Sequence, residues 1–254
     1  MKKILKLTTV VVSMVMALTF VSCANGNTSN NGNENSNENT SNNGNENSNG
    51  NTSNNGNENS NEEELNLVGT YGISKIETLY KKSSEIESSI TMTMQTSTSL
   101  RQYRTDKIKN SETTSVIESE IDVTITKTAN DYSFNWAKYN IDGVAQDDEA
   151  KAAMEENFDD ESWESTTEMF TMTLTTTADG TWSDNYDPVS SGTYTVDEEN
   201  SKVTIKILME GEETLQDPEI MEATYSNNGK TLVVVQEESY NEETQKLTMT
   251  FTRK

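Results

Sequence analysis

The stretch NNGKTLVVVQEESYNEETQKLTMTFTRK, residues 227–254, decides the fold of this chain. Asn227-Asn228-Gly229 predicts a hairpin turn, because Asn and Gly tolerate the backbone angles that such turns require. After the turn, polar and apolar residues alternate towards the chain end, with apolar side chains at Leu247, Met249 and Phe251. A period of two is typical of an antiparallel strand with one buried and one exposed face. The segment therefore predicts antiparallel strands joined by a tight turn.

The same alternation runs through much of the chain upstream. Its apolar positions include Ile121, Val123 and Ile125, then Phe170, Met172 and Leu174, and then Val203, Ile205 and Ile207. Threonine, which is β-branched and favours extended backbone, supplies much of the polar face. The pattern predicts earlier strands at residues 67–80, 88–105, 113–128 and 131–141, and one short helix at about residues 146–157, where alanines lie among charged residues.

These elements predict an all-β fold with one short inserted helix. Ten or so consecutive strands without a long helix fit an antiparallel up-and-down meander. Closing such a meander into a β-barrel removes its exposed edges. We expect residues 65–254 to form this barrel as a single domain.

The N-terminus has the layout of a secretory signal peptide, which we place at residues 1–22. Lys2, Lys3 and Lys6 are followed by a mostly apolar run that is too short and too often interrupted by Thr and Ser to cross a bilayer. Ser22-Cys23 at its end resembles the lipobox of bacterial lipoproteins, in which the cysteine is acylated after cleavage. We expect Cys23 to carry fatty acyl chains such as palmitate, the alternative being an ordinary signal with an incidental cysteine.

A polar repeat tract separates Cys23 from the predicted barrel. Residues 27–38, 39–50 and 51–62 differ only in the last position of a 12-residue Asn/Gly/Ser-rich unit. Because the tract has no apolar residue, nothing offsets the entropy lost on ordering it. We expect residues 23–64 to be a disordered, lipid-anchored tether.

Composition narrows the functional classes. The chain has 43 acidic and 19 basic residues, no histidine and one cysteine, with a formal net charge of −24. Such a charge disfavours nucleic acid as a partner, and the missing histidine removes the usual acid/base group at neutral pH. No nucleophile elbow, phosphate loop or His/Cys metal motif is present, so we expect a protein that is not an enzyme and has no cofactor.

Short motifs in the C-terminal third suggest a family. They are Gly180-Thr181-Trp182, Gly192-Thr193-Tyr194-Thr195-Val196, Gly229-Lys230-Thr231-Leu232 and the closing Phe251-Thr252-Arg253-Lys254, with Leu67-Val68-Gly69-Thr70-Tyr71 as an opening strand. In order and spacing they resemble the lipocalin-like domains of bacterial lipoproteins. That resemblance implies a barrel of about eight strands around a cavity for one small apolar ligand. The chain departs from secreted lipocalins in its missing disulfide, its missing C-terminal helix and its extra strand length before residue 140.

Two kinds of site follow as hypotheses. The candidate cavity residues are Tyr132, Phe134, Trp136, Trp182 and Tyr194, although aromatic residues at strand spacing are also ordinary core residues. The candidate calcium ligands are Asn157, Asp159, Glu161 and Glu168, which match positions 1, 3, 5 and 12 of an EF-hand loop. The alternative for the acidic segment is a solvated loop.

Two functions remain open from the sequence. The first is a monomeric lipoprotein, anchored to a bacterial membrane and displayed at the outer membrane or cell surface, whose barrel binds a small apolar or amphipathic ligand. The second is a surface interaction protein or antigen with a solid barrel that contacts a protein partner. An apolar pocket of about 300 Å³ or more would favour the first function, and a filled barrel would favour the second.

Overall fold

The computed structural model describes residues 64–82, 85–96, 98–109, 113–129, 131–186, 188–240 and 242–254. Cys23, the predicted signal peptide and the repeat tract fall outside these residues. The described strands form an antiparallel sheet that closes on itself through pairing of β13 with β1. The closed ring contains eight strands: β1 (Gly69–Lys82), β7 (Thr173–Thr176), β8 (Thr181–Asp184), β9 (Ser190–Asp197), β10 (Lys202–Glu210), β11 (Glu213–Ser226), β12 (Thr231–Tyr240) and β13 (Glu243–Arg253).

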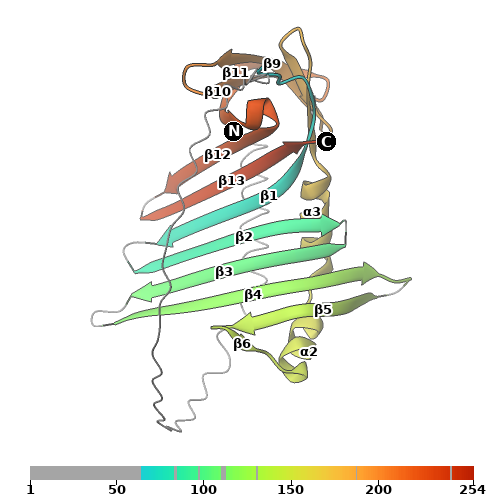
Figure 1. Cartoon of the computed structure of the whole chain (residues 1–254), viewed down its shortest axis with the longest axis vertical. Coiled ribbons are helices and arrows are strands. Elements are labelled where there is room, and N and C mark those ends of the chain that lie inside the picture. Colours follow the sequence, from blue (N-terminus) through green and yellow to red (C-terminus); the bar gives the residue numbers. More distant parts are fainter. Residues whose placement is uncertain are drawn as a thin grey trace, which may run out of the picture.

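Strand β1 belongs to both the barrel and a second, open sheet. Its residues 69–72 pair with β7, whereas residues 76–82 pair with β2 along the same edge. From there the sheet continues away from the barrel (Figure 1). We call this part the extension sheet, and it consists of β2 (Ile86–Thr96), β3 (Ser99–Lys109), β4 (Thr114–Lys127), β5 (Tyr132–Ile141) and β6 (Val144–Ala145).

Two helices lie between β6 and β7 in the chain and pack along the extension sheet (Figure 1). Helix α2 (Asp148–Glu156) starts at Asp147, whose side chain accepts a hydrogen bond from the Ala150 backbone N–H. Helix α3 (Asp160–Thr171) returns the chain to the barrel. Trp163 and Met169 of α3 are buried in the hydrophobic core, so α3 is attached to the sheet by its apolar side.

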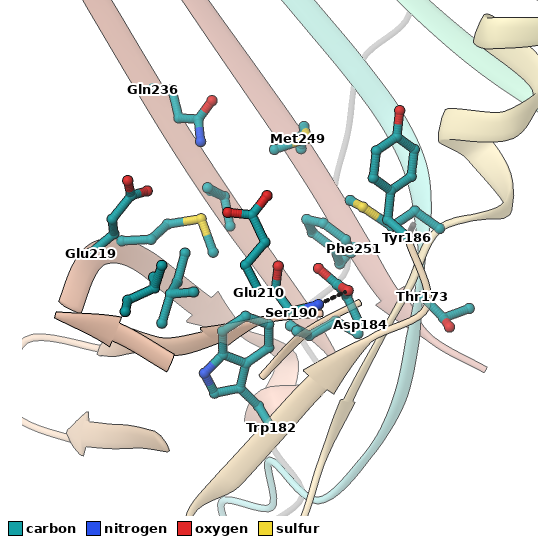
Figure 2. Close-up of a pocket in the computed structure, with 16 residues that line it drawn as sticks. Thr173, Trp182, Asp184, Tyr186, Ser190, Glu210, Glu219, Gln236, Met249 and Phe251 are labelled. Carbon is teal, nitrogen blue, oxygen red and sulfur yellow. Dashed lines mark hydrogen bonds between the residues drawn. The ribbon is translucent and has the colours of Figure 1, made fainter. Parts of the chain in front are cut away.

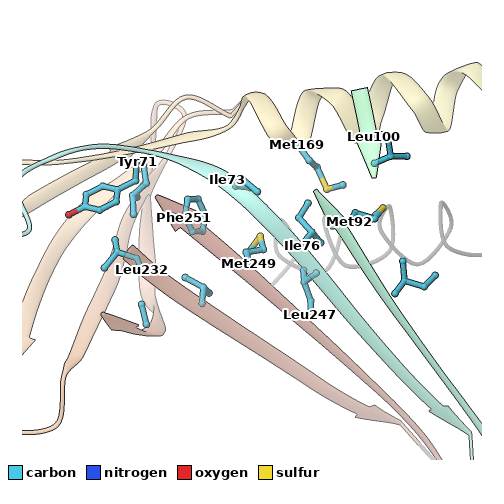
Figure 3. Packing of buried hydrophobic residues seen from close by; sticks show 14 of the residues in the cluster. Tyr71, Ile73, Ile76, Met92, Leu100, Met169, Leu232, Leu247, Met249 and Phe251 are labelled. Carbon is cyan, nitrogen blue, oxygen red and sulfur yellow. The ribbon is translucent and has the colours of Figure 1, made fainter. Parts of the chain in front are cut away.

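The core is continuous from the barrel into the extension sheet. Figure 3 shows a row of buried side chains that runs from Leu232 and Phe251 in the barrel to Ile76 of β1, near which Met169 of α3 lies. At the closed end of the barrel, the side chain of Tyr71 is fully buried. Its hydroxyl lies within hydrogen-bond distance of two acceptors, the Leu67 carbonyl at 2.9 Å and the Gly229 carbonyl at 2.6 Å. The same hydroxyl accepts a hydrogen bond from Arg253. These contacts seal that end.

The all-β antiparallel barrel predicted from the sequence is confirmed, and the hairpin at Asn227–Gly229 joins β11 to β12 as expected. Three details were wrong. The predicted strand at 88–105 is two strands, β2 and β3, with a tight turn between them. A second helix, α3, follows the expected one. The predicted strand start at Phe170 and Met172 instead ends α3 and leads into β7.

Candidate functional site

The barrel is split open between β11 and β12. These strands pair only from Ala223 to Ser226 and from Thr231 to Val234, although both continue well beyond Ala223 and Val234. Strand β11 therefore separates from β12 at this end, whereas β10 stays paired with β9 as far as Glu210. Because side chains of both strands still face inward here, the split opens a pocket into the barrel interior.

The pocket has a volume of about 90 Å³. The closed end of the barrel holds only a void of about 10 Å³, next to Trp182 and Tyr194. Buried apolar residues form much of the wall, while half-buried polar residues also line it (Figure 2). The apolar lining residues are Met172, Leu174, Trp182, Ile207, Leu215, Met221, Val234, Met249 and Phe251.

A β-bulge in β10 builds one side of the pocket. Inward-facing residues alternate up to Ile207, and the register then shifts between Ile207 and Met209 against both neighbouring strands. As a result Glu210, rather than Met209, lies opposite buried Ser190 and lines the pocket. The bulge thus exchanges an apolar side chain for a carboxylate at the pocket wall.

Gly192 of β9 makes this arrangement sterically possible. It pairs with both Trp182 and Ile207, and a Cβ atom there would lie 1.9 Å from the Lys206 carbonyl oxygen. With no side chain in the way, the Trp182 indole reaches across β9 and donates a 3.2 Å hydrogen bond to that same oxygen. Trp182 therefore separates the pocket from the filled end of the barrel.

Three carboxylates line the pocket: Asp184, Glu210 and Glu219. Asp184 accepts a 2.7 Å hydrogen bond from the Ser190 backbone N–H, which fixes its position (Figure 2). The phenol of Tyr186 also lines the pocket, and burial together with the charge of Glu168 raises its pKa above the ordinary value. The phenol of Tyr186 therefore stays neutral around pH 7.

The predicted aromatic residues lie in three places: the main pocket, the small void at the closed end, and the extension sheet. Trp182 lines the pocket, and Tyr194 lines the small void and donates a 2.7 Å hydrogen bond to the Thr177 carbonyl. Tyr132, Phe134 and Trp136 lie instead on β5 of the extension sheet. The structure therefore brings one of the five candidates to the main pocket.

On the extension sheet these aromatic residues hold the helices. The ring of Phe158, between α2 and α3, lies 4.9 Å from the rings of Tyr132 and Phe134. Trp136 donates a 2.6 Å hydrogen bond to Glu155 of α2. The role of these three residues in this structure is packing between sheet and helices.

The four candidate calcium ligands do not form a loop around a common point. Asn157 caps α2, Asp159 accepts a hydrogen bond from the Glu161 backbone, and Glu161 and Glu168 both lie on α3. These two glutamates are seven positions apart in the helix, which separates them by about 10 Å along the axis. Within the described part of the chain, no group of three or more acidic, histidine or cysteine residues is arranged to hold a metal ion.

Several pocket residues were missed from the sequence. The inward position of Glu210 was missed because the bulge shifts the alternation of β10 by one residue. Glu219 and Met221 were missed because they lie near Pro218, where no alternation was recognised. Met249 and Phe251 were recognised as apolar strand positions but not as pocket residues. The motifs that contain Trp182 and Gly192 were the signals in the sequence that marked this region.

Comparisons with known proteins identify no family for this chain. The sequence matches no protein-family model and no curated protein. The crystal structure of LprF from Mycobacterium bovis is similar at 12% identity and a TM-score of 0.20, covering 70% of this chain and 84% of LprF. At this level the likeness carries no weight for fold or function. Among the described residues, no helix has the length and apolar character needed to cross a membrane.

Proposed function

We propose that the barrel binds the apolar end of a small amphipathic molecule in the pocket between β11 and β12. The observation that carries this proposal is the split in the barrel, which exposes a cavity lined by Trp182, three methionines and Phe251. Methionine adapts its shape to different apolar ligands, and aromatic walls offer a large contact area. A filled barrel with a complete β11–β12 ladder would have no such opening.

The volume of the pocket limits how much of a ligand the barrel can enclose. Pockets that surround a whole drug-sized ligand measure about 300–1,000 Å³, and this pocket measures about 90 Å³. The pocket is thus smaller than the size of about 300 Å³ that would favour a ligand enclosed by the barrel, and the proposal is limited to one end of an alkyl chain or a small ring, with the remainder of the molecule extending through the split. This is why the proposal concerns an amphipathic ligand rather than a fully enclosed one.

The proposal places the barrel at a bacterial membrane surface. The lipobox-like Ser22-Cys23 supports acylation of Cys23, and the polar repeats support a flexible tether to the barrel. We therefore propose a lipoprotein displayed at the outer membrane or cell surface. Cys23→Ser should release the protein from the membrane fraction, and a variant that still fractionates with membranes would contradict lipid anchoring.

Binding is tested by titrating the protein with 1-octanol, an uncharged probe, and recording heat by calorimetry. We expect saturable binding that Met221→Trp abolishes, because the larger indole fills the cavity. Ile220→Trp, which changes the exposed neighbouring residue on the other face of β11, serves as the matched control. Equal binding by the two variants would show that octanol does not enter the pocket.

The second candidate function is contact with a protein partner. Ile220 is 68% exposed and Met209 is 37% exposed, and both lie on the outer side of the β10–β11 hairpin. Ile220→Lys should abolish the binding of a protein that contacts this hairpin, and it should leave octanol binding in the pocket unchanged. If octanol does not bind, and a protein partner is found whose binding requires Ile220, the second function is favoured.

A further inference from the structure

Strand β12 has a long edge that no described strand covers. All of residues 231–240 pair with β13, but only residues 231–234 pair with β11 on the other side. The split that opens the pocket therefore also leaves residues 235–240 of β12 without a neighbouring strand on that side, within the part of the chain that the structure describes. An open strand edge of this kind is able to pair with another extended chain.

The free edge offers backbone donors and acceptors at defined positions. The Lys230 carbonyl, just before β12, accepts a 2.9 Å hydrogen bond from the Arg253 backbone N–H of β13. The backbone groups of successive strand residues point to opposite edges, and the β12–β13 register has no shift. The N–H and C=O groups of Val235, Glu237 and Ser239 therefore point away from β13 and towards the split.

The same edge runs past the apolar pocket. Val234 and Gln236 of β12 line the pocket, which has a volume of about 90 Å³. Residues directly opposite each other on neighbouring strands point to the same face of the sheet. A chain paired with β12 would therefore direct the side chain opposite Gln236 into the pocket. The volume suits one aliphatic side chain, since pockets for whole small molecules are several times larger.

Charge complementarity decides which extended chain fits this edge. Glu237 and Glu238 of β12 and Glu222 of β11 are exposed beside the split, and Lys202 and Lys246 on the neighbouring strands offset only part of this charge. A second copy of this chain, paired through the same edge of β12, would bring like charges together. The polar repeat tract of the chain itself has no apolar side chain for the pocket. A basic segment from another protein satisfies both the charge and the pocket.

We propose that the split barrel binds an extended basic peptide segment of another protein, which pairs with the free edge of β12 and inserts one aliphatic side chain into the pocket. This inference rests on the proposed function, since that side chain takes the place of the apolar end of the ligand. Backbone hydrogen bonds to Val235, Glu237 and Ser239 supply affinity, and the pocket and the exposed glutamates select which segment binds.

The probe is a synthetic peptide of the sequence Lys-Thr-Lys-Leu-Lys-Thr-Lys with acetylated and amidated ends. When it pairs with β12, alternation directs its leucine towards the barrel and its lysines outwards. The full chain carrying Cys23→Ser is titrated with this peptide by calorimetry at about 0.15 M salt, which screens interactions between distant charges. We expect saturable binding at one site.

Two modified peptides separate the backbone contribution from the side-chain contribution. N-methylation of the two lysines beside the leucine keeps the charge and the side chains but removes two backbone donors, so this peptide should bind about tenfold more weakly. Serine in place of the leucine should also weaken binding about tenfold, because the pocket then receives no aliphatic group.

Two substitutions at one position of the protein separate edge pairing from charge. Glu237→Pro removes a backbone N–H that points to the split and leaves the β12–β13 hydrogen bonds in place. It should weaken peptide binding about fivefold. Glu237→Ala is the matched control, because it removes the same charge and keeps the N–H, and it should weaken binding by less than about twofold. Both variants should bind 1-octanol as the unsubstituted protein does.

The outcomes distinguish the two proposals. If octanol binds and the peptide does not, or if the N-methylated peptide binds as tightly as the unmodified one, pairing with the β12 edge is overturned and the apolar pocket stands. Equal weakening by Glu237→Ala and Glu237→Pro would also overturn it, since charge alone would then explain the binding. A protein dimer that Glu237→Pro dissociates would overturn it in favour of a second copy at this edge. If neither octanol nor the peptide binds, the proposed function itself fails.

Discussion

Replacing Gly192 by alanine tests how the pocket is built. A Cβ atom at this position would lie 1.9 Å from the Lys206 carbonyl oxygen, 3.0 Å from its carbonyl carbon and 3.1 Å from the Leu208 nitrogen. All three are backbone atoms, so no side-chain rotation relieves the contact. The β9 and β10 backbones must therefore move apart by more than 1 Å at the bulge.

The expected cost follows from two terms. Overpacking in a well-packed interior costs about 1–3 kcal/mol, and loss of the Trp182 hydrogen bond to Lys206 costs about 1 kcal/mol more. We expect Gly192→Ala to lower the free energy of unfolding by about 2–4 kcal/mol. For a domain of this size, each 1 kcal/mol lowers Tm by about 2–4 °C, which gives a decrease of about 4–16 °C.

The assay is thermal unfolding of the full chain, followed by far-UV circular dichroism. Thr193→Ala is the matched control, because Thr193 is the next residue on β9 and its side chain is exposed. Its Tm should lie within about 3 °C of the wild type. A Tm for Gly192→Ala as close to the wild type as that of Thr193→Ala would refute the role assigned to Gly192.

Three further predictions concern other parts of the molecule. Tyr71→Phe should cost about 1–3 kcal/mol in urea unfolding, because it removes a fully buried hydroxyl with three hydrogen-bond partners, and an unchanged midpoint would contradict the seal at the closed end. Phe158→Ala should cost about 2–4 kcal/mol and increase amide exchange in α2 and α3, since it removes ring contacts to β5; unchanged exchange would contradict the packing role. Hydrogen bonds from Lys81 and Lys107 lower the pKa of Glu87 to about 2, so its stabilising contribution is complete above its ordinary pKa and is lost as the pH falls through about 2. A carboxyl NMR titration midpoint near the ordinary value would disprove this last prediction.

Strands with a regular period of two were predictable from the sequence. In β4, β10 and β13 the apolar residues alternate with Thr, Lys or Asp, and burial of one face follows directly. The division of residues 88–105 into two strands was not predictable in this way. The sequence that joins β2 to β3 contains only Ser and Thr at residues 97–98, without the Gly, Pro or Asn that usually marks a turn.

Helix α3 was missed because its threonines and alternating Phe170 and Met172 favour a strand. In the structure the hydroxyls of Thr167 and Thr171 donate hydrogen bonds to the carbonyls of Glu164 and Glu168, so these residues are satisfied within the helix. Burial of Trp163 and Met169 against the sheet then outweighs the local preference. Such tertiary contacts have no local sequence signal.

The pocket was predictable only in part. Trp182 was identified as a cavity residue from a motif, and Gly192 belonged to another motif of the same resemblance. The carboxylate of Glu210 depends on a one-residue bulge, which shifts the inward face without altering the residues that surround it. Likewise, the split between β11 and β12 depends on where pairing stops, and a strand's own sequence does not specify that point.

The most direct test of the pocket is NMR of methionine methyl groups during titration with 1-octanol. Met172, Met221 and Met249 line the pocket, whereas Met209 lies outside it on the outer side of β10. We predict saturable shifts of the three pocket methyls with one common dissociation constant, and no change at Met209. Shifts that are absent at the three pocket methyls, or equally large at Met209, would contradict a ligand site in the split barrel.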